Sequence, residues 1–133
     1  MVLPLCIALV VVGAFALWQA QMRMSAAVEV LSTVQWARLE KKLSAIGLFY
    51  VPMAFAVTAY FFLRGSPQLP MAMAICAAVL TAISMGIAVW RTFVFKAIVG
   101  DLSIVGTYRR SAVLHAAGVS LLFGAAALFA AYQ

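Results

Sequence analysis

The stretch LPMAMAICAAVLTAISMGIAVW, residues 69–90, contains no charged side chain over its whole length. A helix of about 20 apolar residues is long enough to cross the roughly 30 Å hydrocarbon core of a bilayer. Three more stretches share this character, and the four predicted spans cover residues 2–22, 43–63, 69–90 and 111–132. A membrane β-barrel would show short strands of alternating polarity instead. We therefore predict an all-α integral membrane protein, a four-helix transmembrane bundle.

The composition of the whole chain agrees with this prediction. Of its 133 residues, 68% are hydrophobic and 9% are charged, whereas soluble domains are about 45–50% apolar and about 25% charged. This excludes an ordinary soluble enzyme, a disordered linker and a nucleic-acid-binding module. Four spans use most of the chain, so residues 1–133 are expected to form a single transmembrane domain. No Lys or Arg precedes the first stretch, which is longer than a signal-peptide core, so we predict a retained helix.

The basic residues predict an orientation. The connectors 23–42 and 91–110 hold eight of the nine Lys and Arg residues, and the connector 64–68 holds only Arg64. Basic loops face the cytoplasm, so both termini are expected outside it, in a bacterial inner (plasma) membrane. Gly65-Ser66-Pro67 predicts a tight outer turn. Leu-Pro opens both the first and third spans, which suggests two hairpins of one layout, arising by duplication or by convergence.

The two inner connectors are long, basic and apolar. Val28, Leu31 and Val34 recur at helical spacing, which predicts either a continued first helix or an amphipathic helix on the inner membrane surface. Gly100 and Gly106 are expected to interrupt the second connector. Its many apolar residues need cover from lipid or from another protein.

Four basic residues lie in pairs at the inner ends of two spans: Lys41, Lys42, Arg109 and Arg110. Such pairs attract the headgroups of anionic lipids, at about 1 kcal/mol per charge. The lipid bilayer and its anionic lipids are therefore expected partners, although topology setting alone also accounts for the charges.

The sequence lacks the residue sets that catalysis requires. The three acids, Glu29, Glu40 and Asp101, all lie in the inner connectors. A membrane acid is common in proton-coupled transporters, so its absence argues against a self-sufficient proton-driven exporter. One histidine without a membrane acid cannot complete a Ser–His–Asp set, and neither a phosphate loop nor a zinc spacing occurs. We assign no catalytic residue, no metal site and no resident cofactor, and we predict that the chain is not an enzyme.

His115 is the one residue with an open chemical role. It lies about one turn into the fourth span. It could ligate haem, contact a quinone or relay a proton, with a partner or a second copy completing the site. The alternative is a hydrogen-bonded histidine at a helix–helix contact. Cys6 and Cys76 stand alone in apolar runs and are expected to be buried as small hydrophobic residues.

Small residues recur at a spacing of four on two spans, where they let helices approach closely in lipid. These candidate partner-interface residues are Ala82, Gly86, Ala116, Ser120 and Gly124. Packing inside the chain's own bundle is the alternative. Pro52 lies within the second span and predicts a kink near Leu48.

Together these features predict a non-catalytic accessory or scaffolding subunit of a larger integral membrane complex, which contacts other membrane protein subunits or itself. It would pack through small-residue helix faces and apolar cytoplasmic connectors. Two alternatives are a small homo-oligomeric channel or transporter and a membrane-anchor subunit of a redox enzyme that uses His115.

Overall fold

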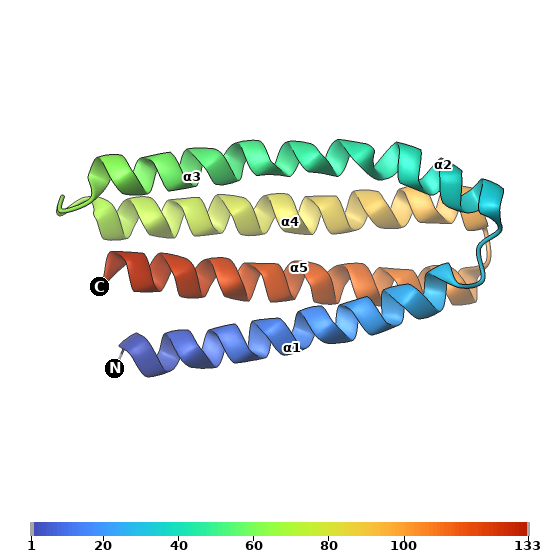
Figure 1. The fold of residues 1–133 in the computed structure, drawn as a ribbon, viewed down its shortest axis with the longest axis horizontal. Coiled ribbons are helices and arrows are strands. Elements are labelled where there is room, and N and C mark those ends of the chain that lie inside the picture. Colours follow the sequence, from blue (N-terminus) through green and yellow to red (C-terminus); the bar gives the residue numbers. More distant parts are fainter. Residues whose placement is uncertain (1, 133) are drawn as a thin grey trace.

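The computed structural model describes residues 2–132, apart from the side chains of residues 45 and 46. Within this range, four helices are long and apolar enough to cross a membrane, which confirms the predicted all-helical architecture (Figure 1). Three of them are α1 (Val2–Val28), α4 (Leu69–Val99) and α5 (Leu102–Ala131). The remaining one is built from α2 (Thr33–Leu43), a 3-10 helix, η1 (Ser44–Phe49), and α3 (Tyr50–Leu63).

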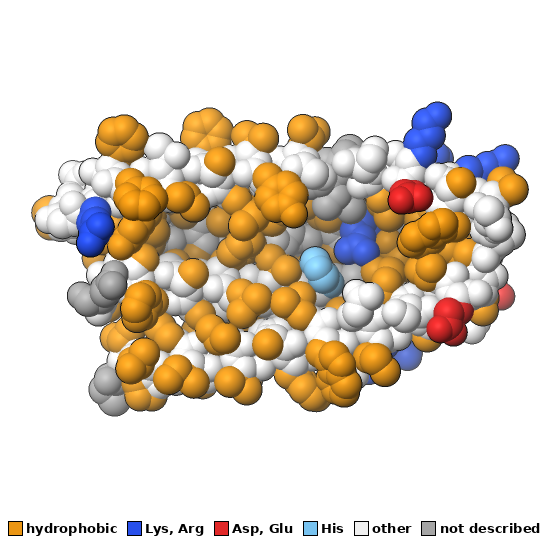
Figure 2. All heavy atoms as spheres, viewed as in Figure 1, with side chains coloured by type: hydrophobic (Ala, Val, Ile, Leu, Met, Phe, Trp, Pro, Cys, Tyr) orange, Lys and Arg blue, Asp and Glu red, His pale blue; other side chains and the backbone are white. Residues whose placement is uncertain are grey.

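The long helices lie side by side in the order α1, α5, α4, α3 (Figure 1). Both termini and the turn at residues 64–68 lie at one end of the bundle. The turns at residues 29–32 and 100–101 lie at the other end, which we call the basic end because most of the basic side chains visible in Figure 2 gather toward it.

The segment 91–110 is a helical hairpin rather than a loop. Gly100 ends α4 in the left-handed conformation (φ 74°), and its N–H donates to the Lys96 carbonyl. The Asp101 side chain then caps α5 by accepting a hydrogen bond of 2.9 Å from the Ser103 N–H. The expectation that Gly106 interrupts this segment is wrong, because α5 runs through it. With 31 residues at about 1.5 Å each, α4 is about 46 Å long and extends beyond a 30 Å hydrocarbon core.

The segment 23–42 is helical on both sides of a short turn. Helix α1 continues to Val28, which is one of its two predicted forms, and a separate helix α2 follows the turn. Ser32 and Gln35 form a capping box at the start of α2, with reciprocal hydrogen bonds of 3.1 and 3.2 Å. The 3-10 helix η1 separates α2 from α3 and includes Leu48, near which the sequence predicts a kink. Pro52 consequently lies in the first turn of α3, where its missing N–H costs least.

Helices α1 and α5 meet along small residues spaced seven apart, which we call the small-residue seam. This spacing keeps one face of each helix against the other over many turns. On α1 the seam consists of Cys6, Gly13, Ala20 and Ala27, and on α5 it includes Ser111, Gly118 and Ala125.

Contacts across the seam are unusually close. A Cβ atom placed on Gly118 would lie 2.9 Å from the Gly13 carbonyl oxygen, and the reciprocal distance is 3.0 Å. The Ser111 hydroxyl donates to the Ala20 carbonyl at 2.7 Å. The two backbones can approach this closely because Gly13 and Gly118 have no Cβ atom. Helices α1 and α5 therefore form a closely packed pair.

A hydrophobic core lies at the basic end, where α1, α2, α4 and α5 meet. Its buried members are Ala27, Leu39, Phe95, Val105 and Tyr108. A smaller cluster of alanines, Ala88, Ala112 and Ala116, joins α4 to α5 nearer the middle. By contrast, α3 buries none of its residues.

Candidate functional site

A polar cluster surrounds Arg91 of α4, which is half-buried near the basic end. Its Nε donates to the Tyr108 hydroxyl of α5 at 3.2 Å, and its Nη2 lies 3.9 Å from the Met24 sulfur of α1. The Tyr108 ring stacks on Phe95, with centroids 4.0 Å apart and planes 8° apart. Arg91 of α4 thus contacts side chains of two other helices, α1 and α5.

This arrangement holds a cation that meets no counterion among the described residues. Among the residues that the structure describes, Arg91 pairs with no carboxylate, and its partners are a phenol and a thioether. A charge near the membrane boundary is costly unless it is hydrated or meets an anion. The cluster can therefore attract anionic groups.

The structure places His115 on α5 with its side chain exposed, and Figure 2 shows the histidine in a hollow of this face. Within residues 2–132 it makes no hydrogen bond, so the alternative of a histidine satisfied at a helix contact is not what the structure shows. The imidazole is open to a ligand from outside the chain, and its role as a cofactor ligand stays a prediction.

Candidate metal ligands are dispersed. Within residues 2–132 no three His, Cys, Asp or Glu side chains come together to hold a metal ion. Cys6 and Cys76 are free thiols. Cys6 is buried in the small-residue seam, where its sulfur lies 3.6 Å from the Ala125 carbonyl oxygen, whereas Cys76 is half-buried.

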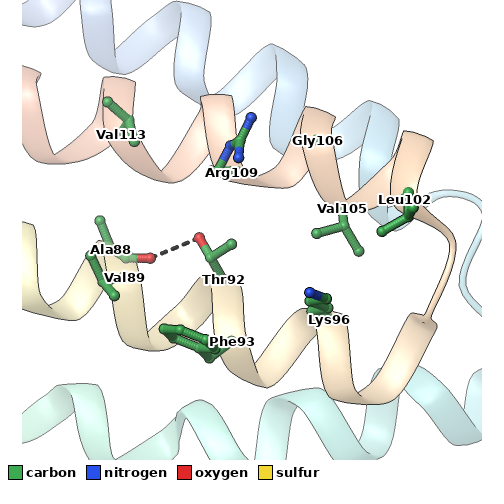
Figure 3. A pocket seen from close by; sticks show the side chains of 10 residues that line it. All are labelled: Ala88, Val89, Thr92, Phe93, Lys96, Leu102, Val105, Gly106, Arg109 and Val113. Atoms are coloured by element: carbon green, nitrogen blue, oxygen red, sulfur yellow. Dashed lines mark hydrogen bonds between the residues drawn. The ribbon is translucent and has the colours of Figure 1, made fainter.

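The four residues predicted to meet lipid headgroups are all exposed toward the basic end. Lys41 and Lys42 lie in the last turn of α2. Arg109 and Arg110 lie on α5, next to the buried Ser111. Arg109 also borders a groove between α4 and α5, shown in Figure 3, whose volume is about 410 Å³.

The predicted partner-interface residues divide into two groups. Ala82 and Gly86 are exposed on α4, and a Cβ atom added to Gly86 would meet nothing within 4 Å. Ala116 is buried against the α4 alanine Ala88, which corresponds to the alternative of packing inside the bundle. Ser120 is half-buried and donates to the Ala116 carbonyl of its own helix, and Gly124 is half-buried with open space beside it.

No protein-family model, curated protein or solved structure matches this chain. Its function is therefore inferred from its own residues.

Sequence reasoning missed the contact between Arg91 and Tyr108. Both residues lie in the segment that the sequence predicts to be a connector, and a connector has no defined helix face. A signal was present, because Gly100-Asp101 is a helix stop followed by an N-cap residue. Arg91 and Tyr108 lie nine and eight residues from Gly100, which is the pairing that a helical hairpin requires.

Proposed function

We propose that this chain is a non-catalytic accessory or scaffolding subunit of a larger integral membrane complex. In this proposal the basic end faces the cytoplasm, as the positive-inside rule favours, and both termini lie on the opposite side. Other membrane subunits pack on α3 and on the face of α4 that points away from α5.

The observation that carries this proposal is the packing of α3. None of its 14 residues is buried, and a hollow of about 340 Å³ is lined by α3, α4 and α5. Helices in lipid gain little by burying apolar surface from one another, since lipid tails are equally apolar, so their association depends on close packing. The chain itself supplies little such packing for α3, which favours a partner that supplies it.

A second feature supports the same conclusion. Along α4, four small residues at a spacing of four, Ala74, Ala78, Ala82 and Gly86, are all exposed. The chain's own packing uses the other side of α4, through Met73, Leu80 and Ser84. The exposed row offers a neighbouring helix the same close approach that Gly13 offers to α5.

Native mass spectrometry after extraction in a mild detergent tests this proposal, with the chain tagged at its C-terminus. We expect stoichiometric foreign membrane subunits with the wild type and their loss with Gly86→Leu. The fold should tolerate this substitution, because the added side chain meets open space. Ala14→Leu, at an exposed alanine of α1, is the matched control and should keep the subunits.

Two outcomes would overturn the proposal. One is a wild-type chain that appears only as a monomer or as copies of itself, which would favour a channel or transporter. The other is equal release of partners by Gly86→Leu and Ala14→Leu, which would show that the α4 face has no special role.

A further inference from the structure

The groove between α4 and α5 near the basic end combines apolar walls with two cations. Figure 3 shows α4 residues lining one side and α5 residues lining the other. Lys96 comes from α4 and Arg109 from α5, and both side chains are exposed. None of the described residues that line the groove is acidic. Its charge is therefore uniformly positive.

The charges of the two cations are not neutralised by the part of the chain that the structure describes. Among residues 2–132, neither Lys96 nor Arg109 forms an ion pair or a hydrogen bond. The nearest acid in the sequence, Asp101, accepts from the Ser103 N–H and does not line the groove. Two unpaired cations on separate helices can hold one anionic group between them.

The apolar part of the groove continues away from these cations. Val89 and Val113 lie further from the Gly100 turn than Lys96 and Arg109 do, so they are deeper in the membrane when the basic end lies at its surface. Gly106 keeps the groove open, because a Cβ atom added there would meet nothing within 4 Å. Thr92 adds little polarity, since its hydroxyl donates to the Ala88 carbonyl of its own helix.

We propose that this α4–α5 groove binds an anionic phospholipid of the leaflet that meets the basic end. The headgroup phosphate lies between Lys96 and Arg109, and an acyl chain covers the apolar walls. Basic pockets between membrane helices on the cytoplasmic side recognise anionic lipids by this combination of charge and apolar contact. Binding at this site is more specific than the general attraction of anionic lipids to exposed lysines, because it requires both cations and the open space at Gly106.

The purified full chain, in detergent micelles, is titrated with phosphatidylglycerol or with phosphatidylcholine of identical acyl chains, and native mass spectrometry counts the bound lipid. We expect one phosphatidylglycerol to bind more tightly than phosphatidylcholine. At about fivefold per charge, Lys96→Gln with Arg109→Gln should weaken phosphatidylglycerol binding by about 25-fold. Circular dichroism checks that this variant remains helical, as expected from two exposed side chains without partners.

The matched control is Arg23→Gln with Arg38→Gln. It removes the same charge from two exposed residues outside the groove, so phosphatidylglycerol binding should be nearly unchanged. Gly106→Leu fills the groove and should weaken binding of both lipids. Excess inorganic phosphate should not displace the phospholipid, because the acyl chain contributes to binding.

Four results would each overturn the proposal. These are equal affinity of the wild type for the two lipids, equal losses in the two double variants, no effect of Gly106→Leu, and displacement by inorganic phosphate. The second would indicate diffuse attraction by the net charge, and the last would indicate a site for a free anion.

Discussion

Helix α1 and helix α3 are both apolar membrane helices, yet they are held in the bundle very differently. Helix α1 places Gly13 and Ala20 against α5 so closely that the backbones nearly touch. Helix α3 presents large side chains such as Phe55 and Phe62, which are 72% and 83% exposed. Apolar composition is common to both, so it does not explain the difference.

The contrast follows from what lipid does to helix association. In water, the phenyl rings of α3 would drive it against its neighbours, whereas in a bilayer they are equally well solvated by acyl chains. Small residues on matched faces then decide which helices pack tightly. The chain thus has a tightly packed part, α1–α5–α4, and a loosely packed helix, α3, which is connected to the core at the basic end through Leu39 of α2.

The largest expected difference in stability is between alanine substitutions of two phenylalanines. Phe95 is fully buried and stacks on Tyr108, in the core at the basic end, whereas Phe55 is exposed on α3. We expect Phe95→Ala to lower the free energy of unfolding by about 3–5 kcal/mol. Phe55→Ala should change it by less than about 0.5 kcal/mol, as surface substitutions usually do. Equilibrium unfolding in micelles, followed by circular dichroism, measures both. Similar losses for the two variants would show that α3 is packed as firmly as the core.

Much of this arrangement could be predicted from sequence because the signals are local. Uncharged runs locate the four spans, and Gly65-Ser66-Pro67 locates the turn that joins α3 to α4. Pro70 stands in the first turn of α4, as expected from its missing N–H. Each of these features depends on residues that are close together in the chain.

The rest depends on which segments face each other. The spacing of seven from Cys6 to Ala27 can be read in the sequence, but its partner face begins more than 80 residues later, at Ser111. The groove at Lys96 cannot be predicted from the sequence for a different reason. Glycine at position 106 suggested an interrupted connector, whereas packing against α4 keeps α5 helical there. Local propensity gives way to tertiary packing at such positions.

A smaller effect is expected from glycine substitutions along α5. Gly118→Ala would place its Cβ atom 2.9 Å from both the Gly13 carbonyl oxygen and the Leu17 Cγ atom, so the seam must open. We expect a loss of about 1–3 kcal/mol in the free energy of unfolding, as for overpacked cores. Gly124→Ala is the matched control, because its Cβ atom meets nothing within 4 Å. The same unfolding assay compares them. A Gly118→Ala variant as stable as Gly124→Ala would mean that close approach does not hold α1 to α5.

The smallest contrast tests whether the hydrogen bond across the seam contributes beyond packing. The Ser111 hydroxyl donates to the Ala20 carbonyl of α1 at 2.7 Å, whereas the Ser120 hydroxyl donates at the same distance within α5 itself. Ser111→Ala should cost about 0.6 kcal/mol, the average for such bonds between membrane helices. Ser120→Ala should cost less, because its bond joins no second helix. Repeated unfolding measurements on both variants can resolve this difference. If Ser120→Ala costs as much as Ser111→Ala, the seam is held by its small residues alone, and the difference between α1 and α3 is one of shape.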